Sequence, residues 1–439
     1  MKFDRFYASA KENNVSPLEV VYSSSKSLSV EVFNDTVEEY KESNDSNITL
    51  RGIYDGKLGT VSADNASPKM ADEYIKTLIS GAKFGLPGDP SLFISKGQKY
   101  KKERKLNEAC ANYPGKDMIA DTMYISKKVR EIEPRIALAF VGIEKSVSAE
   151  EFSNSNGLKL TSKGAYMVLF AQTKIVDGDK VETDFKFDVI EDPATFDKEK
   201  FIDELVKSSV SRLGGDSIKS KKYNVVFSQK AVAQLIRPLI SQLSAFSVKQ
   251  HLSLFENKLG EKVLSNKLTI TENPHANNPF SSRFDREGMP TVKKVLIKKG
   301  VPTTYLYDLE SAKEAGCAST GNAGMSGGNI RPSLGFIEIK EGKYSFDELL
   351  ANVKNGVYID TLEGIGTGYN TQSGDYSLQA DGYEIKDGKL GNPVTLITVA
   401  GNVLKDFSKI IAVGNDSKLY FNSVSSPSIA IRSLSISGK

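Results

Sequence analysis

Histidine is almost absent from this chain: His251 and His275 are the only two in 439 residues. A zinc-peptidase helix needs two imidazoles on one face, usually four residues apart, with a glutamate beside the first. The residue four positions after His251 is Phe255, and His275 follows a proline in the loop-like segment ENPHANN. One histidine and the nearby acid Glu256 do not make a three-ligand site, so the sequence excludes a zinc helix of this kind.

Cysteine, membrane-spanning segments and excess charge are scarce as well. Cys110 and Cys317 are the only cysteines, and their wide separation makes a poor disulfide framework. The first residues, MKFDRFYASAKENN, carry charges throughout, unlike a signal peptide, and no apolar run approaches the roughly 20 residues of a membrane span. The formal net charge of +3 is too small to suggest nucleic acid as a partner. We therefore expect a cytoplasmic protein with no membrane and no direct nucleic-acid partner.

What the chain does contain is typical of a globular protein, with 39% hydrophobic and 26% charged residues. Its length exceeds one ordinary core, so we expect two domains. The polar stretch Asp216–Lys222 is the expected linker, between an N-terminal domain over residues 1–218 and a C-terminal domain over residues 222–439. Strands gather in meanders and rarely alternate with helices, which favours the α+β class. Each domain should have an antiparallel or mixed sheet with flanking helices, and the C-terminal one should be mostly β.

In the N-terminal half, apolar spacing predicts four helices and two groups of strands. The helices are expected over Phe3–Asn13, Met70–Phe84, Lys116–Arg130 and Phe196–Leu213. The first strand group covers Leu18–Ser23, Ser27–Asn34, Val37–Ser43, Asn47–Tyr54 and Leu58–Ser62. The second covers Ile136–Ile143, Ser146–Ser153, Lys159–Ser162, Ala165–Val176 and Val181–Phe187. Each group is expected to form a meander.

In the C-terminal half, a strand precedes Ser228, which is a good N-cap for a long helix. This helix is expected to bend at Pro238 and to continue through Val248–Val263. The remainder is mostly β, with a helix after Ser345, which forms a capping box with Glu348. The later strands are expected over Gly356–Leu362, Tyr376–Ile385, Pro393–Val399 and Ile429–Ser437.

The stretch Asp285–Ala323 has the clearest local signals of secondary structure in the chain. Its expected elements are a strand over Val292–Ile297, a turn at Lys299–Gly300, a return strand over Val301–Tyr307, and a helix over Ser311–Ala315 that ends at Gly316. The turn Ser319-Thr320-Gly321-Asn322 follows. Small polar side chains and exposed backbone amides in such a turn suit the close approach of another chain or a ligand, so we expect a binding surface here.

Four motifs could carry chemistry, and each also has a structural explanation. Cys317 would need a base to act as a nucleophile, and no histidine is close in sequence, so a small buried thiol is favoured. Gly324–Gly328 matches the GxSxG nucleophile elbow, but neither a helix start nor a histidine follows, so a flexible loop is favoured. Gly364–Gly368 lacks the strand–turn–helix context of a dinucleotide loop and is better explained as a turn. Asp285 and Glu287 could be a general acid–base pair, or Asp285 could accept hydrogen bonds from the amides of a turn.

Several sequence blocks in the C-terminal half occur together in one known family. They are FDREGMPT at Phe284–Thr291, SAKEAGCASTGNA at Ser311–Ala323, GDYSLQADGYEIKDGKL at Gly374–Leu390, PVTLITVAGNVL at Pro393–Leu404, IIAVGND at Ile410–Asp416 and SPSIAIRSLSISG at Ser426–Gly438. In content and order they resemble the TldD/PmbA family, once called modulators of DNA gyrase, and specifically its PmbA (TldE) branch. The N-terminal half resembles it more loosely, through SVEVFNDTVEEYKES at Ser29–Ser43 and DGKLGTVSADN at Asp55–Asn65.

The resemblance implies a two-domain α+β protein that forms a dimer. In TldD-type members a helix carries a zinc site of the HExxxH type, completed by a cysteine near the C-terminus, which makes a metallopeptidase that acts on unfolded peptides. The corresponding region here, Ser241–Leu259, has no HExxxH, and no cysteine follows Cys317. The chain therefore resembles the metal-free subunit. The resemblance implies no catalytic residue, metal or cofactor in this chain, and zinc in a TldD-like partner.

The resemblance and the turn together suggest how this chain would take part. It would pair with a TldD-like subunit as a heterodimer, or with itself, and help to hold an unfolded peptide by strand addition. The expected peptide-binding residues are Asp285, Glu287, Gly288, Ser319, Thr320, Gly321 and Asn322. Two alternatives stay open: a self-sufficient peptidase that uses Cys317 or the acids Asp285 and Glu287, and a non-enzymatic homodimeric binding protein.

Overall fold

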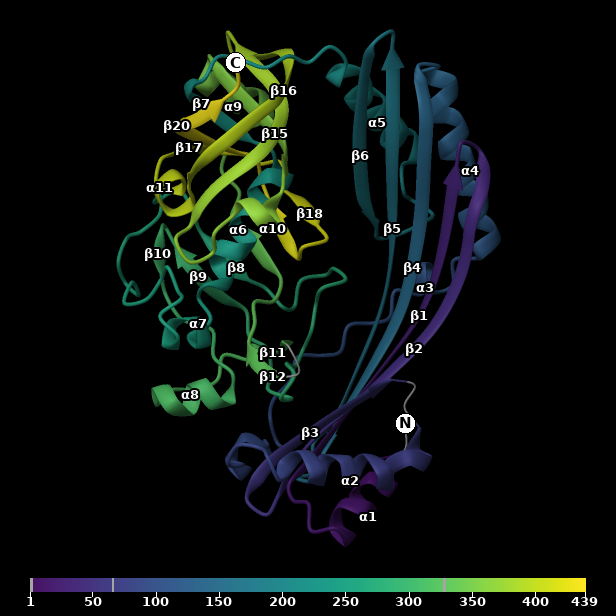
Figure 1. The fold of residues 1–439 in the computed structure, drawn as a ribbon, viewed down its shortest axis with the longest axis vertical. Helices are drawn as coiled ribbons and strands as arrows, with labels where there is room; N and C mark the ends of the chain where they lie inside the picture. Colours follow the sequence, from purple (N-terminus) through teal and green to yellow (C-terminus); the bar gives the residue numbers. More distant parts are fainter. Residues whose placement is uncertain (1–2, 65–66, 327–328) are drawn as a thin grey trace.

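The computed structural model describes residues 3–64, 67–326 and 329–439, and it has two halves that lie side by side (Figure 1). The N-terminal half is built on one antiparallel sheet with the strand order β3-β2-β1-β4-β5-β6. Its strands are β1 (Leu18–Phe33), β2 (Thr36–Tyr54), β3 (Lys57–Asp64), β4 (Ile136–Asn154), β5 (Lys159–Asp177) and β6 (Lys180–Ile190). Four of these strands have 16 to 19 residues, so the sheet extends along the whole molecule.

The strands of this sheet are longer than the sequence predicts. Separate strands are expected over Leu18–Ser23 and Ser27–Asn34, but β1 runs through the serine-rich stretch between them. Ser24 pairs with Ser46 of β2 on one side and with Ala149 of β4 on the other. Because ladder hydrogen bonds on both sides satisfy the backbone, the polar side chains do not end the strand. The breaks predicted within β2, β4 and β5 are wrong as well. At its break β4 is paired on both sides, whereas β2 is paired there with β1 alone and β5 with β4 alone.

The helices predicted in this half are confirmed as α1 (Asp4–Glu12), α2 (Ala71–Ala82), α4 (Gly115–Ile132) and α5 (Lys198–Arg212). Short helical turns occur at η1 (Pro68–Met70), η2 (Pro90–Leu92) and α3 (Glu108–Ala111). Helices α1 and α2 pack against Leu18 and Val20 near the start of β1, and α4 packs against Leu28 and Val30 near its end. Side chains alternate along a strand, so these even-numbered residues place the helices on one face of β1.

The opposite face of β1 contacts the C-terminal half. Val21 belongs to a buried cluster with Phe152 of β4 and with Phe284, a residue of the second half. Between the two ends that helices cover, Tyr22–Ser25 are only half-buried and Lys26 is exposed. One strand thus forms two helix-packed ends, a polar middle and a contact between the halves.

The C-terminal half contains two larger sheets and a hairpin. Its strands are β7 (Lys221–Phe227), β8 (Ile270–Glu272), β9 (Lys294–Lys298), β10 (Val301–Pro302), β11 (Ala323–Ser326), β12 (Asn329–Pro332), β13 (Ile337–Ile339), β14 (Gly356–Glu363), β15 (Asp375–Lys386), β16 (Lys389–Asn402), β17 (Ile410–Val413), β18 (Lys418–Tyr420), β19 (Val424–Ser426) and β20 (Ile429–Ser437). Strands β7, β14, β15, β16 and β20 close into a barrel, because β16 pairs with β20 as well as with β15, and β17 adds to β20. The second sheet has the order β10-β9-β8-β13-β19-β18, and β11 pairs with β12 in the hairpin.

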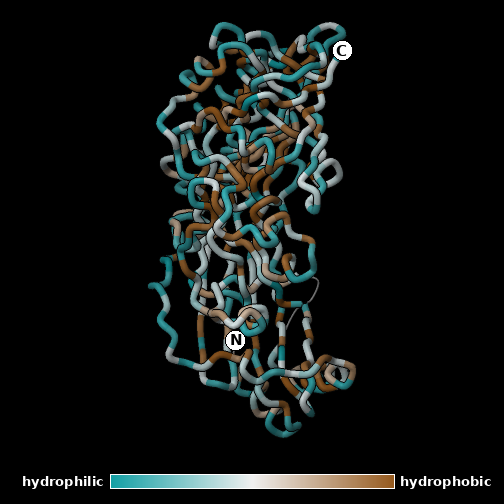
Figure 2. The backbone as a smooth tube through the Cα atoms, turned by 90° about the vertical axis from the view of Figure 1, so that its left-hand side faces the viewer, coloured by the Kyte–Doolittle hydropathy of each residue, from teal (hydrophilic) through white to brown (hydrophobic). Residues whose placement is uncertain are grey.

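Helix α6 (Gln229–Ser241) lies at the centre of this half. Its apolar face, which includes Val232, Leu235 and Leu239, belongs to a large buried cluster with strands of both sheets. Figure 2 shows hydrophobic segments gathered in the interior of this upper part of the molecule. The predicted cap is confirmed, since the Ser228 hydroxyl accepts a hydrogen bond from the amide of Ala231.

Two predictions about this half are wrong. The long helix does not continue through Val248–Val263, because only α7 (Ala245–Lys249) follows α6, and His251 and Asn257 then take left-handed backbone conformations that a helix cannot contain. The return strand over Val301–Tyr307 shrinks to the two residues of β10. Its later part turns away from β9, because the amide of Leu306 donates to the carbonyl of Leu243.

The further helices of this half are α8 (Leu309–Ala315), α9 (Phe346–Val353), α10 (Ile365–Gly368) and α11 (Val403–Phe407). Helices α8 and α9 agree with the local signals in the sequence. Gly316 ends α8 with a left-handed conformation, and Ser345 and Glu348 form the expected capping box on α9. The two-domain α+β class is confirmed, whereas the exact domain boundaries stay a prediction. In the described ranges, no helix combines the length and the apolar character needed to cross a membrane.

Candidate functional site

The first predicted acid, Asp285, lies in the loop between β8 and β9, where the two halves meet. It is 8% exposed, and its carboxylate accepts three hydrogen bonds at 2.9 Å, from the backbone amides of Glu287, Met289 and Ala323. Burial raises the pKa of Asp285 to about 6, and the three amides oppose this rise. Asp285 therefore ties its own loop to the start of β11, which confirms the turn explanation of this residue.

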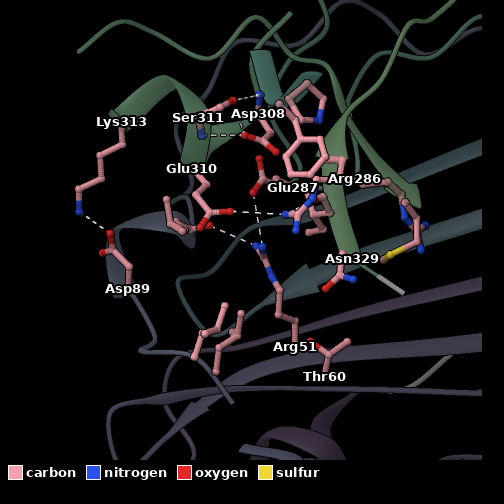
Figure 3. A pocket seen from close by; sticks show the side chains of 18 of the residues that line it. Arg51, Thr60, Asp89, Arg286, Glu287, Asp308, Glu310, Ser311, Lys313 and Asn329 are labelled. Atoms are coloured by element: carbon pink, nitrogen blue, oxygen red, sulfur yellow. Dashed lines mark hydrogen bonds and ion pairs between the residues drawn. The ribbon is translucent and has the colours of Figure 1, made fainter. Parts of the chain in front are cut away.

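Glu287 is the acid that faces a cavity between the halves (Figure 3). It is 1% exposed, and its carboxylate accepts a hydrogen bond of 2.8 Å from the amide of Leu309 at the start of α8. The other oxygen, Oε1, lies 3.4 Å from the guanidinium of Arg51 in β2, and Arg51 also lies 3.2 Å from Glu19 in β1. Burial raises the pKa of Glu287 to about 8, and Arg51 opposes this rise. A buried arginine between two carboxylates thus joins the two halves.

Gly288 brings its loop into contact with the N-terminal sheet. Its φ of +76° is in the left-handed region, and its carbonyl accepts a hydrogen bond of 2.7 Å from the Tyr100 hydroxyl. A Cβ at this position would lie 2.9 Å from side-chain atoms of Leu158 and Phe152. Both the backbone conformation and the contact with β4 therefore require glycine here.

Backbone and side-chain groups of the turn Ser319–Asn322 form hydrogen bonds within the chain. The amide of Thr320 donates to the carbonyl of Tyr307, and its hydroxyl accepts a hydrogen bond of 2.7 Å from the amide of Tyr307. The amide of Gly321 donates to the Ser319 hydroxyl. The prediction of exposed backbone amides is therefore wrong for Thr320 and Gly321, because the chain folds back on the segment before α8 and uses them itself.

Asn322 belongs to a buried polar network beneath this turn. Its side-chain nitrogen donates to Glu272 at 2.8 Å and to the carbonyl of Ser333 at 3.0 Å. Its side-chain oxygen accepts a hydrogen bond of 2.9 Å from Lys294, which also pairs with Glu272. The side chain of Asn322 is thus committed to the chain's own structure, and a peptide-binding role for Ser319–Asn322 stays a prediction.

The cavity beside Glu287 has a volume of about 720 Å³. Strands β1 to β3 and the 86–93 segment form one wall, and α7, α8 and β12 form the other. Arg331 lies over the ring of Phe246 at 4.5 Å, and an ion pair between Lys313 and Asp89 connects the two walls. Glu287 is the one predicted binding residue among the residues that line this cavity.

The sequence reasoning missed the N-terminal side of this cavity. Arg51 and Glu19 line it and are both buried, and Arg286 of the C-terminal half reaches across to pair with Glu150 of β4 at 2.7 Å. One signal could have found Arg51: it is a lone charge in the apolar strand segment LRGI, and a charge inside such a strand needs a buried partner. The position of that partner, 236 residues away, is not visible in the sequence.

Each of the two histidines contacts a polar side chain in the structure. The side chain of His251 is 79% exposed and lies 2.7 Å from Glu256, while the His275 ring lies 3.1 Å from the Thr291 hydroxyl. A peptidase zinc needs three protein ligands, so His251 and Glu256 do not fit the zinc ion of the TldD-type site. In residues 3–64, 67–326 and 329–439, no three histidine, cysteine, aspartate or glutamate side chains converge as a metal site requires. Cys317 is exposed, so the prediction of a buried thiol is wrong; it follows the C-cap glycine of α8 and points away from the core.

The two glycine motifs have structural roles. Gly324–Ser326 lies in β11 of the hairpin, so this part of the expected flexible loop is a strand, and Gly327 and Gly328 lie outside the described residues. Gly364 has a φ of +77° and starts the single helical turn of α10. Strand β14 precedes Gly364, but α10 has only four residues and ends at Gly368, so this segment lacks the longer helix of a dinucleotide loop.

Two family models match this chain. Residues 220–438 match the PmbA/TldA metallopeptidase C-terminal domain, and residues 18–82 match PmbA/TldA metallopeptidase domain 1. This chain belongs to the PmbA/TldD family. The resemblance seen in the sequence blocks is thus confirmed, and the match to domain 1 extends it to the strands that carry Glu19 and Arg51.

Relatives within the PmbA/TldD family cover different shares of the chain. Metalloprotease PmbA of Escherichia coli O157:H7 is 23% identical over 435 residues, which are 96% of this chain and 92% of that protein. A metalloprotease PmbA homologue of Buchnera aphidicola subsp. Baizongia pistaciae is 31% identical over 264 residues, which are 60% of this chain. The chain spans 57% of the length of that relative.

Solved structures of the PmbA/TldD family share this fold. A Thermotoga maritima protein named as a modulator of a DNA gyrase superposes with a TM-score of 0.89 at 27% identity, over 99% of both chains. TldE from Thermococcus kodakarensis superposes with a TM-score of 0.88 at 22% identity, over 99% of this chain and 100% of that one. The long sheet and the barrel therefore form a fold that these two solved structures share.

Proposed function

We propose that this chain is the PmbA/TldE-like subunit of a TldD/TldE-type metallopeptidase complex that cleaves unfolded peptides in the cytoplasm. The observation that carries the proposal is family membership combined with a missing motif, since the region Ser241–Leu259 has no HExxxH. His251 and Glu256 supply two possible ligands where a peptidase zinc needs three. The zinc ion would be held by a TldD-like partner, and this chain would carry no catalytic residue.

The cavity beside Glu287 is where this chain would help to hold a peptide. Its volume of about 720 Å³ falls within the range of about 300–1,000 Å³ that is usual for ligand sites. One wall includes β12, which belongs to a two-stranded hairpin, and a short sheet of this kind can accept an added strand. Glu287 would face the peptide. The other predicted residues, Asp285, Gly288, Ser319, Thr320, Gly321 and Asn322, would act by holding this wall in place.

The partner and the biological role follow from the same proposal. The chain would form a heterodimer with a TldD-like subunit and would serve peptide maturation or antitoxin turnover. Without the partner it would form homodimers that do not cleave peptides. Nucleic acid would not bind directly.

Purification of the chain alone and together with a TldD-like protein tests the proposal. We expect one complex of both chains in gel filtration, stoichiometric zinc only when the partner is present, and cleavage of an unfolded peptide only by the complex. Stoichiometric zinc and proteolysis by the isolated chain would contradict the proposal. Homodimers that do not bind the TldD-like chain would instead support the alternative that this chain is a non-enzymatic binding protein.

The second candidate is a self-sufficient peptidase that uses Glu287 with Asp285, or Cys317. The raised pKa of Glu287, about 8 at a cavity wall, is the observation that favours testing it, because perturbed acids concentrate at active sites. Asp285 argues against it, since three backbone amides already occupy its carboxylate. Cleavage by the isolated chain that is lost in Glu287→Gln or Cys317→Ala would establish this candidate.

A further inference from the structure

The charged residues that line the cavity beside Glu287 already have partners within the chain. The ion pairs are Arg51 with Glu19 and Glu287, Arg286 with Glu150, Lys249 with Glu314, Lys313 with Asp89, and Arg331 with Glu310. Figure 3 marks the pair of Lys313 and Asp89 with a dashed line. The remaining lining acid, Asp308, caps α8 and is 2% exposed. A charged peptide side chain would therefore meet no uncompensated opposite charge among the described residues of this lining.

Leu86 gives the N-terminal wall an exposed apolar side chain on a fixed backbone. It lines the cavity and is 78% exposed. Its carbonyl accepts a hydrogen bond of 2.9 Å from the amide of Leu58 in β3, and Leu58 lines the cavity too. A Cβ at Gly85 would lie 2.1 Å from the carbonyl oxygen of Leu58, so this close approach requires glycine. The backbone thus holds Leu86 in water, and an apolar ligand group that replaces this water would be stabilised.

The hairpin of β11 and β12 gives the opposite wall two apolar side chains. Met325 pairs with Ile330 in the antiparallel ladder, so their side chains project from the same face of the hairpin. Both line the cavity; Met325 is 40% exposed and Ile330 is half-buried. The unbranched thioether chain of methionine adapts to apolar groups of different shapes. Apolar surface is therefore accessible on both walls of one cavity.

An extended peptide can use both walls at once, because its successive side chains point to opposite sides. One residue would direct its side chain to Leu58 and Leu86, and the next would direct its side chain to Met325 and Ile330. Burial of a leucine side chain raises affinity by about a factor of ten or more. A charged side chain would instead lose its hydration without gaining an unpaired partner.

We propose that the cavity beside Glu287 selects peptide segments with two neighbouring apolar side chains, one against Leu58 and Leu86 and the other against Met325 and Ile330. This inference rests on the proposed function, because it specifies which unfolded peptides the chain would help to hold. Folded proteins bury most segments of this kind, whereas unfolded chains expose them. The preference would thus also favour unfolded chains over folded ones.

Calorimetric titration of the isolated chain with three peptides tests this preference. The peptides have acetylated and amidated ends and the sequences Ser-Thr-Leu-Leu-Thr-Ser, Ser-Thr-Glu-Glu-Thr-Ser and Ser-Thr-Lys-Lys-Thr-Ser. We expect the leucine peptide to bind about tenfold more tightly than either charged peptide. Equal affinity for the three peptides would overturn the proposal. It would also be overturned if neither the chain nor its zinc-free complex with a TldD-like protein bound the leucine peptide.

Matched variants assign the preference to the cavity walls. Leu86→Asn should weaken binding of the leucine peptide about tenfold, and Met325→Gln should weaken it as well, because each removes apolar surface from one wall. Phe84→Asn is the control, since Phe84 is 93% exposed and does not line the cavity, so its affinity should not change. All three side chains are exposed, so the variants should fold. Unchanged affinity in both wall variants, or an equal loss in Phe84→Asn, would overturn the proposal.

The complex with a TldD-like protein separates this preference from the proposed function. Zinc-dependent cleavage of all three peptides at equal rates would support the proposed function and overturn the preference. Selective binding of the leucine peptide by a chain that forms no such complex would contradict the proposed function and support the preference. If Leu86→Asn prevented assembly but bound the leucine peptide normally, Leu86 would belong to the subunit interface, which would overturn the preference.

Discussion

At the junction beside the first cavity, Arg51 lies between Glu19 of its own half and Glu287 of the other, at 3.2 and 3.4 Å. A second cavity, of about 840 Å³, lies between β6 and α5 of the N-terminal half and α6, β14 and β18 of the C-terminal half. At the junction beside this second cavity, Arg212 lies between Asp184 of its own half and Asp360 of the other, at 3.2 and 2.6 Å. Each junction thus places an arginine from the N-terminal half between two carboxylates. This shared plan makes the two junctions directly comparable.

The junctions differ in how much water reaches the carboxylate of the C-terminal half. The Glu287 side chain is 2% exposed, whereas that of Asp360 is 30% exposed. A buried charge that loses its partner keeps its full desolvation penalty, while an exposed one is hydrated. The comparison teaches that the first junction depends on its arginine more strongly than the second, although its ion-pair distance is longer.

The largest expected effect is that of Arg51→Met. Above pH 8, where Glu287 is ionised, this change leaves Glu19 and Glu287 buried without a cation, and we expect a loss of about 3–5 kcal/mol in the free energy of unfolding at pH 9. Arg212→Met, the matched change at the wetter junction, should cost less, about 1–3 kcal/mol. Urea unfolding of both variants measures the two losses in the free energy of unfolding. Equal losses would show that the exposure of the carboxylate does not determine how strongly each junction depends on its arginine.

The next largest loss of stability is expected for a change at Gly288, which lies at the first junction. Gly288→Ala places a Cβ 2.9 Å from Leu158 and Phe152 in a left-handed conformation, so we expect a loss of about 2–3 kcal/mol. Gly316→Ala is the matched control, because Gly316 has a φ of +65° and no atom within 4 Å of the added Cβ. Its loss should be about 1 kcal/mol. Similar losses in thermal melts of the two variants would mean that the contact with β4 contributes nothing.

A smaller effect is the pH dependence of the first junction. Because the pKa of Glu287 in the folded chain is about 8, above its ordinary value of 4.5, folding favours the protonated acid. The contribution of the protonated Glu287 to the free energy of unfolding is complete below pH 4.5 and is lost as the pH rises through 8. Glu287→Gln cannot ionise, so the wild type should lose about 1–2 kcal/mol relative to this variant between pH 6.5 and pH 8. Parallel Tm profiles of the two proteins would refute this linkage.

The smallest effect is expected outside both junctions, at Cys317. This thiol is exposed and lines neither cavity, so Cys317→Ala should change the free energy of unfolding by less than about 0.5 kcal/mol. A thiol reagent should modify Cys317 quickly and the buried Cys110 only after unfolding. Rapid modification of both thiols in the native chain would contradict this placement.

Sequence reasoning succeeded where the decisive contacts are local. The cap at Ser228, the capping box of Ser345 with Glu348 and the helix end at Gly316 each depend on residues within one turn. The amide-bonded carboxylate of Asp285 is partly local too, since two of its three donors lie within four residues. Such features can be predicted because the chain itself brings the groups together.

It failed where partners are distant in sequence. The serine-rich stretch of β1 and the Glu144–Lys145 pair of β4 look like breaks, and the ladders on both sides of each strand keep them extended. Thr320 shows the same limit at the predicted binding turn. Its backbone amide was expected to be exposed, but it donates a hydrogen bond to the carbonyl of Tyr307. The two cavities lie between halves whose contacts no local pattern specifies, so neither could be predicted.

The alternation along β1 has a consequence for insertions and deletions. Deleting one residue within Ser23–Ser27 would turn Leu28 and Val30 away from α4 and present Ser29 to it instead. Deleting two would restore the faces but slide the remaining ladder against β2 and β4. The number of residues in this polar middle is therefore fixed: the stretch acts as a spacer whose length determines which face each end of the strand presents.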